Sequence, residues 1–254
     1  MIEMKRAQFQ RNQRHHQMKK WSFLTLALII FIAIIFIILG HIQANNQARA
    51  RFFAKYPIRG VSLNQDSNYM DFNEFKQRGG SFVYIRSSQG TDYLDDNFND
   101  NYSRSIGSGL KIGVYHQYGF GTSITGQEKN FSRAVDGQIG QLPIRIDIDY
   151  YGKYTDQTVN KQQLHQRIKQ FVNYLYQRYD RPVLIKTNQT NYQTLKNIPH
   201  TQFMLHKGVA GANVTFNNLN SNDSFYKDGK SSDDSMAAYH GNKVQWKQYL
   251  ERME

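Results

Sequence analysis

The sequence predicts an α/β fold: a (β/α) barrel, compact or incomplete and TIM-like, preceded by a single N-terminal transmembrane helix. Residues 21–40 read WSFLTLALIIFIAIIFIILG, an uncharged run long enough to cross a bilayer as a helix. After Pro57, short β-rich runs alternate with amphipathic segments, which is typical of βα units around a mostly parallel sheet. A doubly wound open sheet is the alternative. No Gly-x-Gly-x-x-Gly follows the first strand, which disfavours a dinucleotide-binding version of that fold.

Residues 1–56 divide into three parts by their charge. Residues 1–20 hold six Lys or Arg and one Glu, a net charge of +5, and no positive charge follows the apolar run until Arg49. The positive-inside rule therefore predicts a basic cytoplasmic tail (1–20), a signal anchor (21–40), a stalk (41–56) and an extracellular domain (57–254) at the cell membrane. A cleaved signal peptide is the alternative. The run exceeds the roughly 7–15 apolar residues usual in such a peptide, which favours an uncleaved anchor.

The rest of the charge, +7 of the total +12, belongs to the part outside the membrane. A basic exported domain suits an anionic surface such as a cell wall or lipid headgroups, although an ordinary solvated surface has the same composition. The Lys and Arg residues are scattered and form no recognised binding motif, so nucleic acid is not an expected partner. The absence of cysteine excludes a disulfide framework, a Cys-ligated zinc site and a thiol nucleophile. No cofactor or metal is expected.

The elements of the barrel follow from this alternation along the chain. Strands are expected at 58–63, 81–86, 111–116, 142–149, 182–187 and 202–205. Helices are expected at 71–78, 97–108, 126–135, 158–179 and 191–196, with a loop at 221–235 and a closing helix at 244–250. The segment 158–179 gives the clearest helical signal, because apolar residues recur in it every three or four positions: Val159, Leu164, Ile168, Phe171, Val172 and Leu175.

Two carboxylates stand where the fourth expected strand ends. Asp147 and Asp149 are two positions apart, so an extended backbone directs both side chains to one side. In a (β/α) barrel the chemistry lies at the carboxyl ends of the strands. Two neighbouring carboxylates are expected to separate their pKa values and leave one acid protonated, as acid-catalysed glycoside hydrolysis requires. A pair of solvated loop aspartates and a cation site are the alternatives.

Other strand ends supply polar and aromatic side chains that we expect to bind substrate. These candidates are Ser62, Arg86, Gln89, Tyr115, His116 and Tyr118. Tyr115 and Tyr118 are of the kind that stacks on sugar rings, and equally of the kind that packs a barrel rim. His116 is more typical of a satisfied core histidine than of a catalyst, and the other histidines show no metal-binding spacing.

Six segments carry motifs in a particular order. They read Gly-Val-Ser-Leu-Asn (60–64), Tyr-Ile-Arg-Ser-Ser-Gln-Gly-Thr (84–91), Gly-Val-Tyr-His (113–116), Leu-Pro-Ile-Arg-Ile-Asp-Ile-Asp (142–149), Pro-Val-Leu-Ile-Lys-Thr-Asn (182–188) and Val-Thr-Phe-Asn (214–217). In the same order and spacing they resemble motifs of glycoside hydrolase family 25, the Chalaropsis-type lysozymes. The family motifs are Gly-Ile/Val-Asp-Val-Ser, Ile-Ile-Arg-Ala-Thr-Glu-Gly-Thr, Gly-Ala-Tyr-His, Leu-Pro-Pro-Val-Leu-Asp-Ile-Glu, a strand that ends in Tyr-Thr-Asn, and Val-Asp-Leu-Asn.

The resemblance implies a muramidase that cleaves the β-1,4 bond between N-acetylmuramic acid and N-acetylglucosamine in peptidoglycan. The catalytic Asp-x-Glu of the family falls on Asp147 and Asp149, so the acid is one methylene shorter. A misplacement of about 1 Å lowers a rate on the order of 100-fold. The first-strand aspartate falls on Ser62, the second-strand glutamate on Gln89 and the late aspartate on Thr215.

Two functions are therefore compatible with the sequence. The first is a membrane-anchored, muramidase-like glycoside hydrolase, with Asp149 as the acid and Asp147 as the group that stabilises an oxocarbenium-like or oxazolinium-like species. The second is a catalytically degenerate relative that binds glycan or acts as a cell-wall scaffold, because a shared fold does not by itself secure function.

Overall fold

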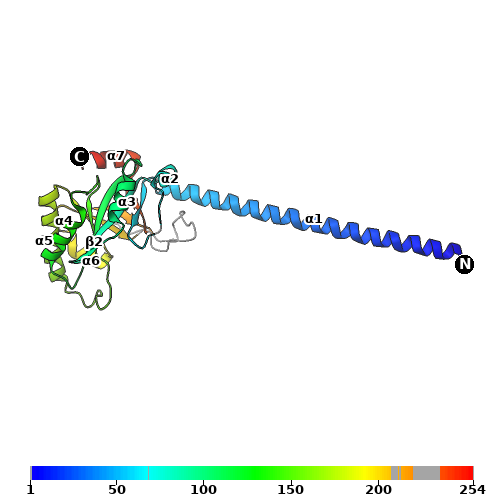
Figure 1. Cartoon of the computed structure of the whole chain (residues 1–254), viewed down its shortest axis with the longest axis horizontal. Helices are drawn as coiled ribbons and strands as arrows, with labels where there is room; N and C mark the ends of the chain where they lie inside the picture. The colour runs from blue at the N-terminus through cyan, green and yellow to red at the C-terminus, as the bar shows by residue number, and fades with distance from the viewer. Residues whose placement is uncertain (1, 68, 207–210, 212, 220–234, 254) are drawn as a thin grey trace. The chain divides into compact units, whose positions relative to one another are not determined.

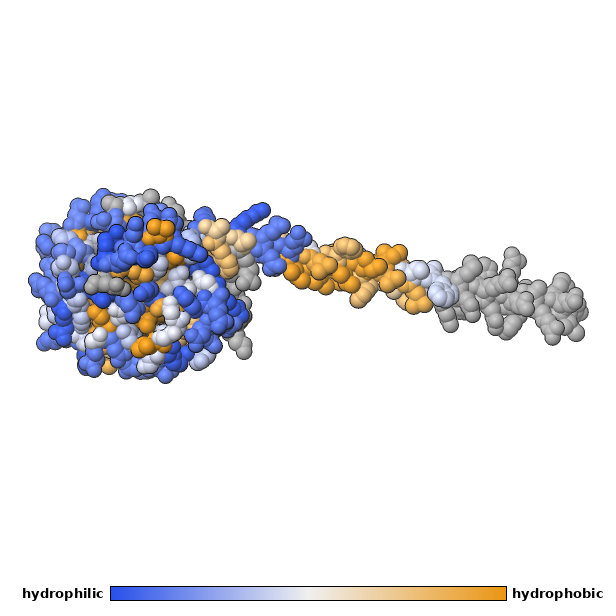
Figure 2. Space-filling model, turned by 90° about the horizontal axis from the view of Figure 1, so that it is seen from above, coloured by the Kyte–Doolittle hydropathy of each residue, from blue (hydrophilic) through white to orange (hydrophobic). Residues whose placement is uncertain are grey.

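The computed structural model describes residues 2–67, 69–206, 211, 213–219 and 235–253. The chain divides into two compact units, Met1–Lys55 and Tyr56–Glu254. The first unit is the helix α1 (Ile2–Lys55), which is uninterrupted in Figure 1. Within the described residues, its portion from Trp21 onward is the one helix long and apolar enough to cross a membrane, and Figure 2 shows its apolar surface as a continuous band. Residues 41–55, expected as a stalk, continue the same helix.

The second unit is built on a closed barrel of eight strands. The strands are β1 (Arg59–Leu63), β2 (Phe82–Gln89), β4 (Lys111–Gln117), β5 (Ile144–Asp147), β6 (Val183–Lys186), β7 (Thr201–His206), β8 (Val214–Asn218) and β9 (Ser235–Tyr239). Strands β1, β2 and β4 to β8 pair in parallel, and β9 lies antiparallel between β8 and β1. The short β3 (Tyr93–Leu94) pairs with β2 outside the ring. The barrel prediction is confirmed, and the open sheet is wrong because β9 joins its two edges.

Helices follow most of the strands and pack around the barrel (Figure 1). They are α2 (Phe72–Gln77), α3 (Phe98–Ser105), α4 (Ile124–Val135), α5 (Lys161–Tyr179), α6 (Gln189–Leu195) and α7 (Lys243–Glu251). Helix α5 begins later than expected, because the Asn160 side chain caps its first turn by accepting a hydrogen bond from the Gln163 amide. Val159 therefore precedes the helix. The other apolar residues of the predicted face are buried: Leu164, Ile168, Phe171, Val172 and Leu175.

Strands β8 and β9 lie outside the predicted set. In β8 only Val214 and Phe216 are buried, and the remaining residues are polar, so its hydrophobic signal is weak. Strand β9 begins at Ser235, the last residue of the segment predicted as a loop; residues 221–234 of that segment lie outside the described residues. Because β9 is antiparallel, it also departs from the strand–helix alternation on which the prediction rests.

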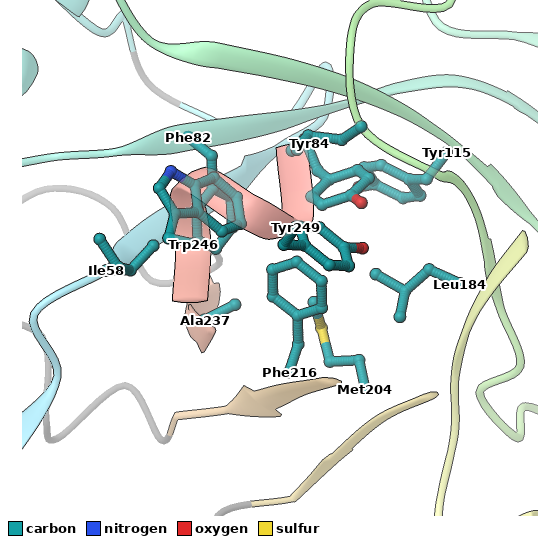
Figure 3. Packing of buried hydrophobic residues seen from close by; sticks show 11 residues of the cluster. Ile58, Phe82, Tyr84, Tyr115, Leu184, Met204, Phe216, Ala237, Trp246 and Tyr249 are labelled. Carbon is teal, nitrogen blue, oxygen red and sulfur yellow. The ribbon is translucent and has the colours of Figure 1, made fainter. Parts of the chain in front are cut away.

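The C-terminal helix α7 closes the amino end of the barrel. Trp246 on α7 packs against Phe82, the first residue of β2, and against Tyr239, the last residue of the antiparallel β9, at ring-centre distances of 5.8 and 5.0 Å. Tyr249 stacks on Trp246 at 5.5 Å, and Figure 3 shows both rings beside Phe82 and Phe216. The expected closing helix is confirmed. With aromatic side chains filling the amino end, the polar interior positions are at the carboxyl ends of the strands.

Candidate active site

The interior of the barrel changes from apolar to polar along the strands. On β6, Leu184 belongs to the apolar core, and Lys186, two residues later on the same face, ends the strand. On β5, Arg145 and Asp147 are likewise two residues apart and face the same way. The sheet register pairs Asp147 with Lys186 and Arg145 with Tyr115, so side chains from three neighbouring strands meet at the carboxyl end.

Asp147 is a buried carboxylate held by two cations. Its Oδ1 accepts a hydrogen bond from Arg145 Nε at 2.6 Å, and its Oδ2 accepts from Arg145 Nη2 at 3.1 Å and from Lys186 Nζ at 3.2 Å. Only 2% of the residue is exposed. Because the guanidinium contact is bidentate, it fixes the orientation of the carboxylate as well as balancing its charge.

Arg145 is completely buried, and three further side chains stabilise it. Its guanidinium carbon lies 4.6 Å from the ring centre of Tyr84 and 4.1 Å from that of Tyr115, within the range of a cation–π contact. Its Nη1 donates to Ser62 Oγ at 2.7 Å. Burial raises the pKa of both tyrosines well above the ordinary value, so their hydroxyls stay neutral. The structure thus brings the expected site residues Ser62, Tyr115 and Asp147 together around Arg145.

Asp149 lies beyond the end of β5, with 53% of its side chain exposed. Its Oδ2 is 3.5 Å from Lys186 Nζ, so one ammonium group contacts Asp147 and Asp149. The two carboxylates therefore face the same side, as the alternation predicts. Burial lowers the pKa of Lys186, but the carboxylates of Asp147 and Asp149 raise it by more. The net pKa is above the ordinary value, so Lys186 is positive at neutral pH.

The electrostatic setting differs from the one expected for two isolated carboxylates. Asp147 contacts both Arg145 and Lys186, and Asp149 contacts Lys186, so neither carboxylate stands without a cation beside it. We call the residues at this end of the barrel the mouth cluster: Ser62, Arg145, Asp147, Asp149 and Lys186. Its charged members carry two positive and two negative charges, so the cluster is neutral rather than acidic.

Arg86, Gln89 and Tyr118 lie at the same end of the barrel. The Tyr118 backbone amide donates a hydrogen bond to the Asp147 carbonyl oxygen at 2.9 Å, whereas Arg86 and Gln89 have partners outside the mouth cluster. Arg86 Nε donates to Asp95 Oδ2 at 2.7 Å, and its guanidinium carbon lies 5.3 Å from the ring centre of Tyr93. Gln89, the last residue of β2, pairs with Tyr93, the first residue of the antiparallel β3. Tyr118 is only 1% exposed, so its ring is packed inside the protein and not presented to a ligand.

His116 lies on the outer face of β4, in the layer between the sheet and the helices. Its fully buried ring packs edge-on against Phe131 and Phe171 at 6.2 and 5.3 Å. Nδ1 is 2.9 Å from Ser88 Oγ, and Nε2 is 3.1 Å from Gln127 Oε1. Burial lowers the pKa of His116 to about 4, so the imidazole is neutral. The expected contact of His116 with substrate does not fit this position, because both ring nitrogens are engaged inside the protein.

Arg145 and Lys186 are the mouth-cluster residues that the sequence reasoning missed. Lys186 is the single charge in the otherwise apolar β6, Val-Leu-Ile-Lys, and Arg145 shares β5, Ile-Arg-Ile-Asp, with one other charge, Asp147. A buried charge requires a partner of opposite sign. Arg145 stands two residues before Asp147, on the same strand face, so the spacing of these two residues held a usable signal. The contact with Lys186 depends on the pairing of β5 with β6.

Comparison with known proteins identifies the family of this barrel. The sequence profile of Glycosyl hydrolases family 25 matches residues 61–208, which is more than half of the chain. The chain belongs to this family. The matched segment begins in β1 and ends just after β7, so it includes every residue of the mouth cluster.

Two curated relatives illustrate the range of family 25 similarity. An autolytic lysozyme of Clostridium acetobutylicum is 28% identical over 119 residues, which cover 46% of this chain and 35% of that protein. The uncharacterized protein YegX of Escherichia coli (strain K12) is 24% identical over 149 residues, covering 57% of this chain and 53% of YegX. The chain thus spans about a third to a half of the length of these relatives.

Solved structures share the fold of this family 25 domain. A family 25 glycosyl hydrolase from Bacillus anthracis superposes with a TM-score of 0.66 at 20% identity, covering 76% of this chain and 94% of that one. The bacterial lysozyme from Streptomyces coelicolor superposes with a TM-score of 0.63 at 21% identity, covering 78% and 98%. At these identities the likeness establishes the barrel fold.

Three residues of the mouth cluster differ from the family motifs in ways that make the site less acidic. Ser62 stands at the aspartate of the first motif, which removes a carboxylate. Arg145 stands at the valine of Leu-Pro-Pro-Val-Leu-Asp-Ile-Glu, and Lys186 at the tyrosine of Tyr-Thr-Asn, which adds two cations. The structure shows that these changes are linked, because Arg145 contacts Ser62 and Asp147, and Lys186 contacts both carboxylates.

Proposed function

We propose that this chain is a membrane-anchored, muramidase-like glycoside hydrolase that acts on β-1,4 bonds between N-acetylmuramic acid and N-acetylglucosamine in peptidoglycan. Residues 1–20 form the cytoplasmic tail, residues 21–40 the anchor and residues 41–56 the stalk. The barrel, residues 57–254, faces the cell wall. Family membership and the apolar helix α1 support this proposal, and the charge of the first twenty residues supports the orientation.

The observation that carries the catalytic part is the different setting of the two carboxylates. Asp149 is exposed at the open end of the barrel, whereas Asp147 is buried and fixed by Arg145. In the proposed reaction Asp149 donates a proton to the glycosidic oxygen as the C1–O bond breaks. Asp147 faces the positively charged sugar species. Water then adds its hydroxyl to C1 and returns a proton to Asp149, so the proton balance closes.

The remaining expected residues take supporting places in the proposal. Ser62 and Tyr115 hold Arg145, which in turn orients Asp147. Arg86 and Gln89 lie along the β2 side of the open end, where a glycan strand would pass. Because Asp149 is one methylene shorter than glutamate and lies beside Lys186, we expect hydrolysis to be slower than with the family's Asp-x-Glu, on the order of 100-fold.

A specific observation also favours a second function, the binding of glycan without hydrolysis. Arg145 and Lys186 both contact Asp147, so these three side chains together carry a net positive charge. A positive group of this kind stabilises a cationic transition state less well than a lone carboxylate does. In this alternative the open end of the barrel still receives a peptidoglycan strand, but no bond is cleaved.

Purified peptidoglycan separates the two functions. The full chain, in detergent micelles, is incubated with the polymer while new reducing ends and protein in the pellet are both measured. Release of reducing ends that disappears in Asp149→Asn supports the hydrolase. Binding in the pellet with no release, equal in wild type and Asp149→Asn, supports the glycan-binding protein.

A further inference from the structure

A cluster of aromatic rings lies at the same end of the barrel as the mouth cluster. We call Phe120, Tyr151 and Tyr154 the rim platform. Phe120 follows β4, and the two tyrosines follow β5, so all three lie on loops at the carboxyl ends of neighbouring parallel strands. Phe120 stacks on Tyr154 with ring centres 5.1 Å apart and an interplanar angle of 22°. Tyr151 meets them at 6.0 and 5.5 Å, in tilted and edge-on contacts.

The rim platform presents its rings to solvent instead of filling the core. Tyr151 is 44% exposed, and Phe120 and Tyr154 are half-buried. The Tyr151 hydroxyl accepts a hydrogen bond from the Phe120 amide at 3.2 Å, which ties one loop to the other. Exposed aromatic clusters on soluble domains mark ligand or partner sites, because leaving their apolar surface in water is unfavourable.

A buried polar network holds the loop that carries Phe120. Gln127 Oε1 accepts from the Gly119 amide at 2.8 Å, and Gln127 Nε2 donates to the Gly119 carbonyl at 2.9 Å. Because that oxygen is an acceptor, His116 Nε2 must carry its hydrogen and donate to it. His116 Nδ1 then accepts from the Ser88 hydroxyl. His116 is therefore a positioning residue, which fixes the backbone next to Phe120.

A second network holds the loop that carries the two tyrosines. Lys161 Nζ donates to the Tyr150 hydroxyl at 2.6 Å, and to Asp156 Oδ1 and Asn191 Oδ1 at 3.0 Å each. The Tyr150 hydroxyl is also 2.8 Å from Asp156 Oδ1. These contacts join α5 and α6 to side chains that precede and follow Tyr151 in the loop. Two separate networks thus hold the rim platform, as a rigid binding surface requires.

We propose that the rim platform stacks on the apolar face of a pyranose ring in an N-acetylated glycan strand, at the sugar next to the bond that Asp149 addresses. Tyr151 follows Asp149 by two residues, a reach of at most about 7 Å along the chain, so the rim platform lies beside the proposed acid. Aromatic rings bind the C–H face of a sugar while the polar edge of the ring stays hydrated. This inference rests on the proposed function, because it names the substrate subsite beside the mouth cluster.

Binding measured without hydrolysis tests the rim platform. The full chain carrying Asp149→Asn, in detergent micelles, is titrated with a soluble tetrasaccharide of alternating N-acetylglucosamine and N-acetylmuramic acid. Added Tyr151→Ala or Tyr154→Ala is expected to raise Kd about tenfold. Added Tyr151→Phe keeps the ring and is expected to bind within about twofold of the parent.

A matched control lies at the other end of the barrel. Tyr176 stacks on His200 at 3.6 Å, and His200 directly precedes the amino end of β7. Added Tyr176→Ala is expected to leave Kd unchanged. Circular dichroism melting establishes whether each variant is folded. If Tyr151→Ala does not fold, the Kd of Tyr154→Ala is used instead.

The outcomes separate the rim platform from the proposed hydrolysis. Unchanged Kd in folded Tyr151→Ala and Tyr154→Ala, or no binding by the parent, overturns the inference. If the wild-type chain releases no reducing ends but Kd still depends on Tyr151 and Tyr154, the hydrolase proposal fails and the rim platform stands. If reducing ends are released and Kd does not depend on the platform, the hydrolase stands and the inference fails.

Discussion

Arg145 on β5 reaches across the barrel interior and donates a 2.7 Å hydrogen bond from Nη1 to Ser62 Oγ on β1. In the family 25 motif the position of Ser62 is an aspartate, and the position of Arg145 is a valine. Ser62 therefore replaces an acidic group by a neutral one, and Arg145 replaces an apolar group by a cation. The two replacing residues are in direct contact. The same guanidinium orients Asp147, so a change at the first strand is connected to the proposed catalytic pair.

Removing the ammonium group beside Asp149 is expected to speed hydrolysis. Lys186 Nζ contacts both Asp147 and Asp149, and a positive charge at this position opposes the positive charge that develops on the sugar in the transition state. Lys186→Met keeps the length of the side chain without the charge. We expect reducing ends to appear several-fold faster, on the scale of about 1 kcal/mol for a partly exposed charge pair.

A control for Lys186→Met uses a lysine remote from the mouth cluster. Lys247 and Glu251 form an exposed pair at 3.9 Å on α7, at the closed end of the barrel. Lys247→Met is expected to leave the rate of hydrolysis unchanged. A rate that falls in Lys186→Met would show that the ammonium group assists the reaction rather than opposing it.

Arg145→Met is expected to destabilise the barrel strongly. The substitution leaves Ser62 without its donor and Asp147 with only Lys186 as a charged partner. Breaking a buried ion pair by removing one partner costs about 3–5 kcal/mol. For a domain of this size that lowers Tm by roughly 6–20 °C, measured by calorimetry. Lys247→Met, which breaks an exposed pair, is the matched control, with an expected change below about 0.5 kcal/mol.

Much of the barrel is predictable, because each strand from β1 to β7 apart from the two-residue β3 has a local β-rich signal. The closure by β8 and β9 is not, since it arises from pairing between distant segments. The two-residue spacing along an extended backbone correctly predicts that Asp147 and Asp149 face one side, where both contact Lys186. For Tyr115 and His116, alternation alone shows that neighbouring strand residues face opposite ways, so only one of them could line the interior.

The stability of the protein is expected to depend on pH through His116. Its pKa is lowered to about 4 in the folded state by burial, against an ordinary value of 6.5. The unfolded chain therefore binds more protons between these values, and the contribution of His116 is complete above pH 6.5 and is lost as the pH falls toward 4. The full effect is on the order of 3 kcal/mol.

Thermal melts at several pH values test this dependence. The wild-type Tm is expected to fall between about pH 6.5 and pH 4, and His116→Gln is expected to show a shallower decline over that range. A decline of equal slope in both proteins would place the responsible groups elsewhere. Because His116 positions the Phe120 loop, His116→Gln is also expected to weaken glycan binding without altering the mouth cluster.

The absence of native cysteine makes the proposed topology directly testable. Single substitutions Gln8→Cys and Lys153→Cys place one thiol before the apolar run and one in the barrel. A membrane-impermeant maleimide added to intact cells is expected to label the second and to label the first only after permeabilisation. The reverse pattern would contradict the orientation. A membrane-free product lacking the first forty residues would instead identify a cleaved signal peptide.

The central claim is that Asp149 is the acid of a peptidoglycan hydrolase, and its side-chain length and charge can be varied separately. Reducing ends are counted after peptidoglycan is incubated with full-length wild type, Asp149→Asn and Asp149→Glu, from about pH 4 to pH 8. The account predicts slow release by wild type, none by Asp149→Asn, and faster release by Asp149→Glu, which restores the missing methylene. Equal release by wild type and Asp149→Asn, or no release by wild type and Asp149→Glu at any of these pH values, would contradict it.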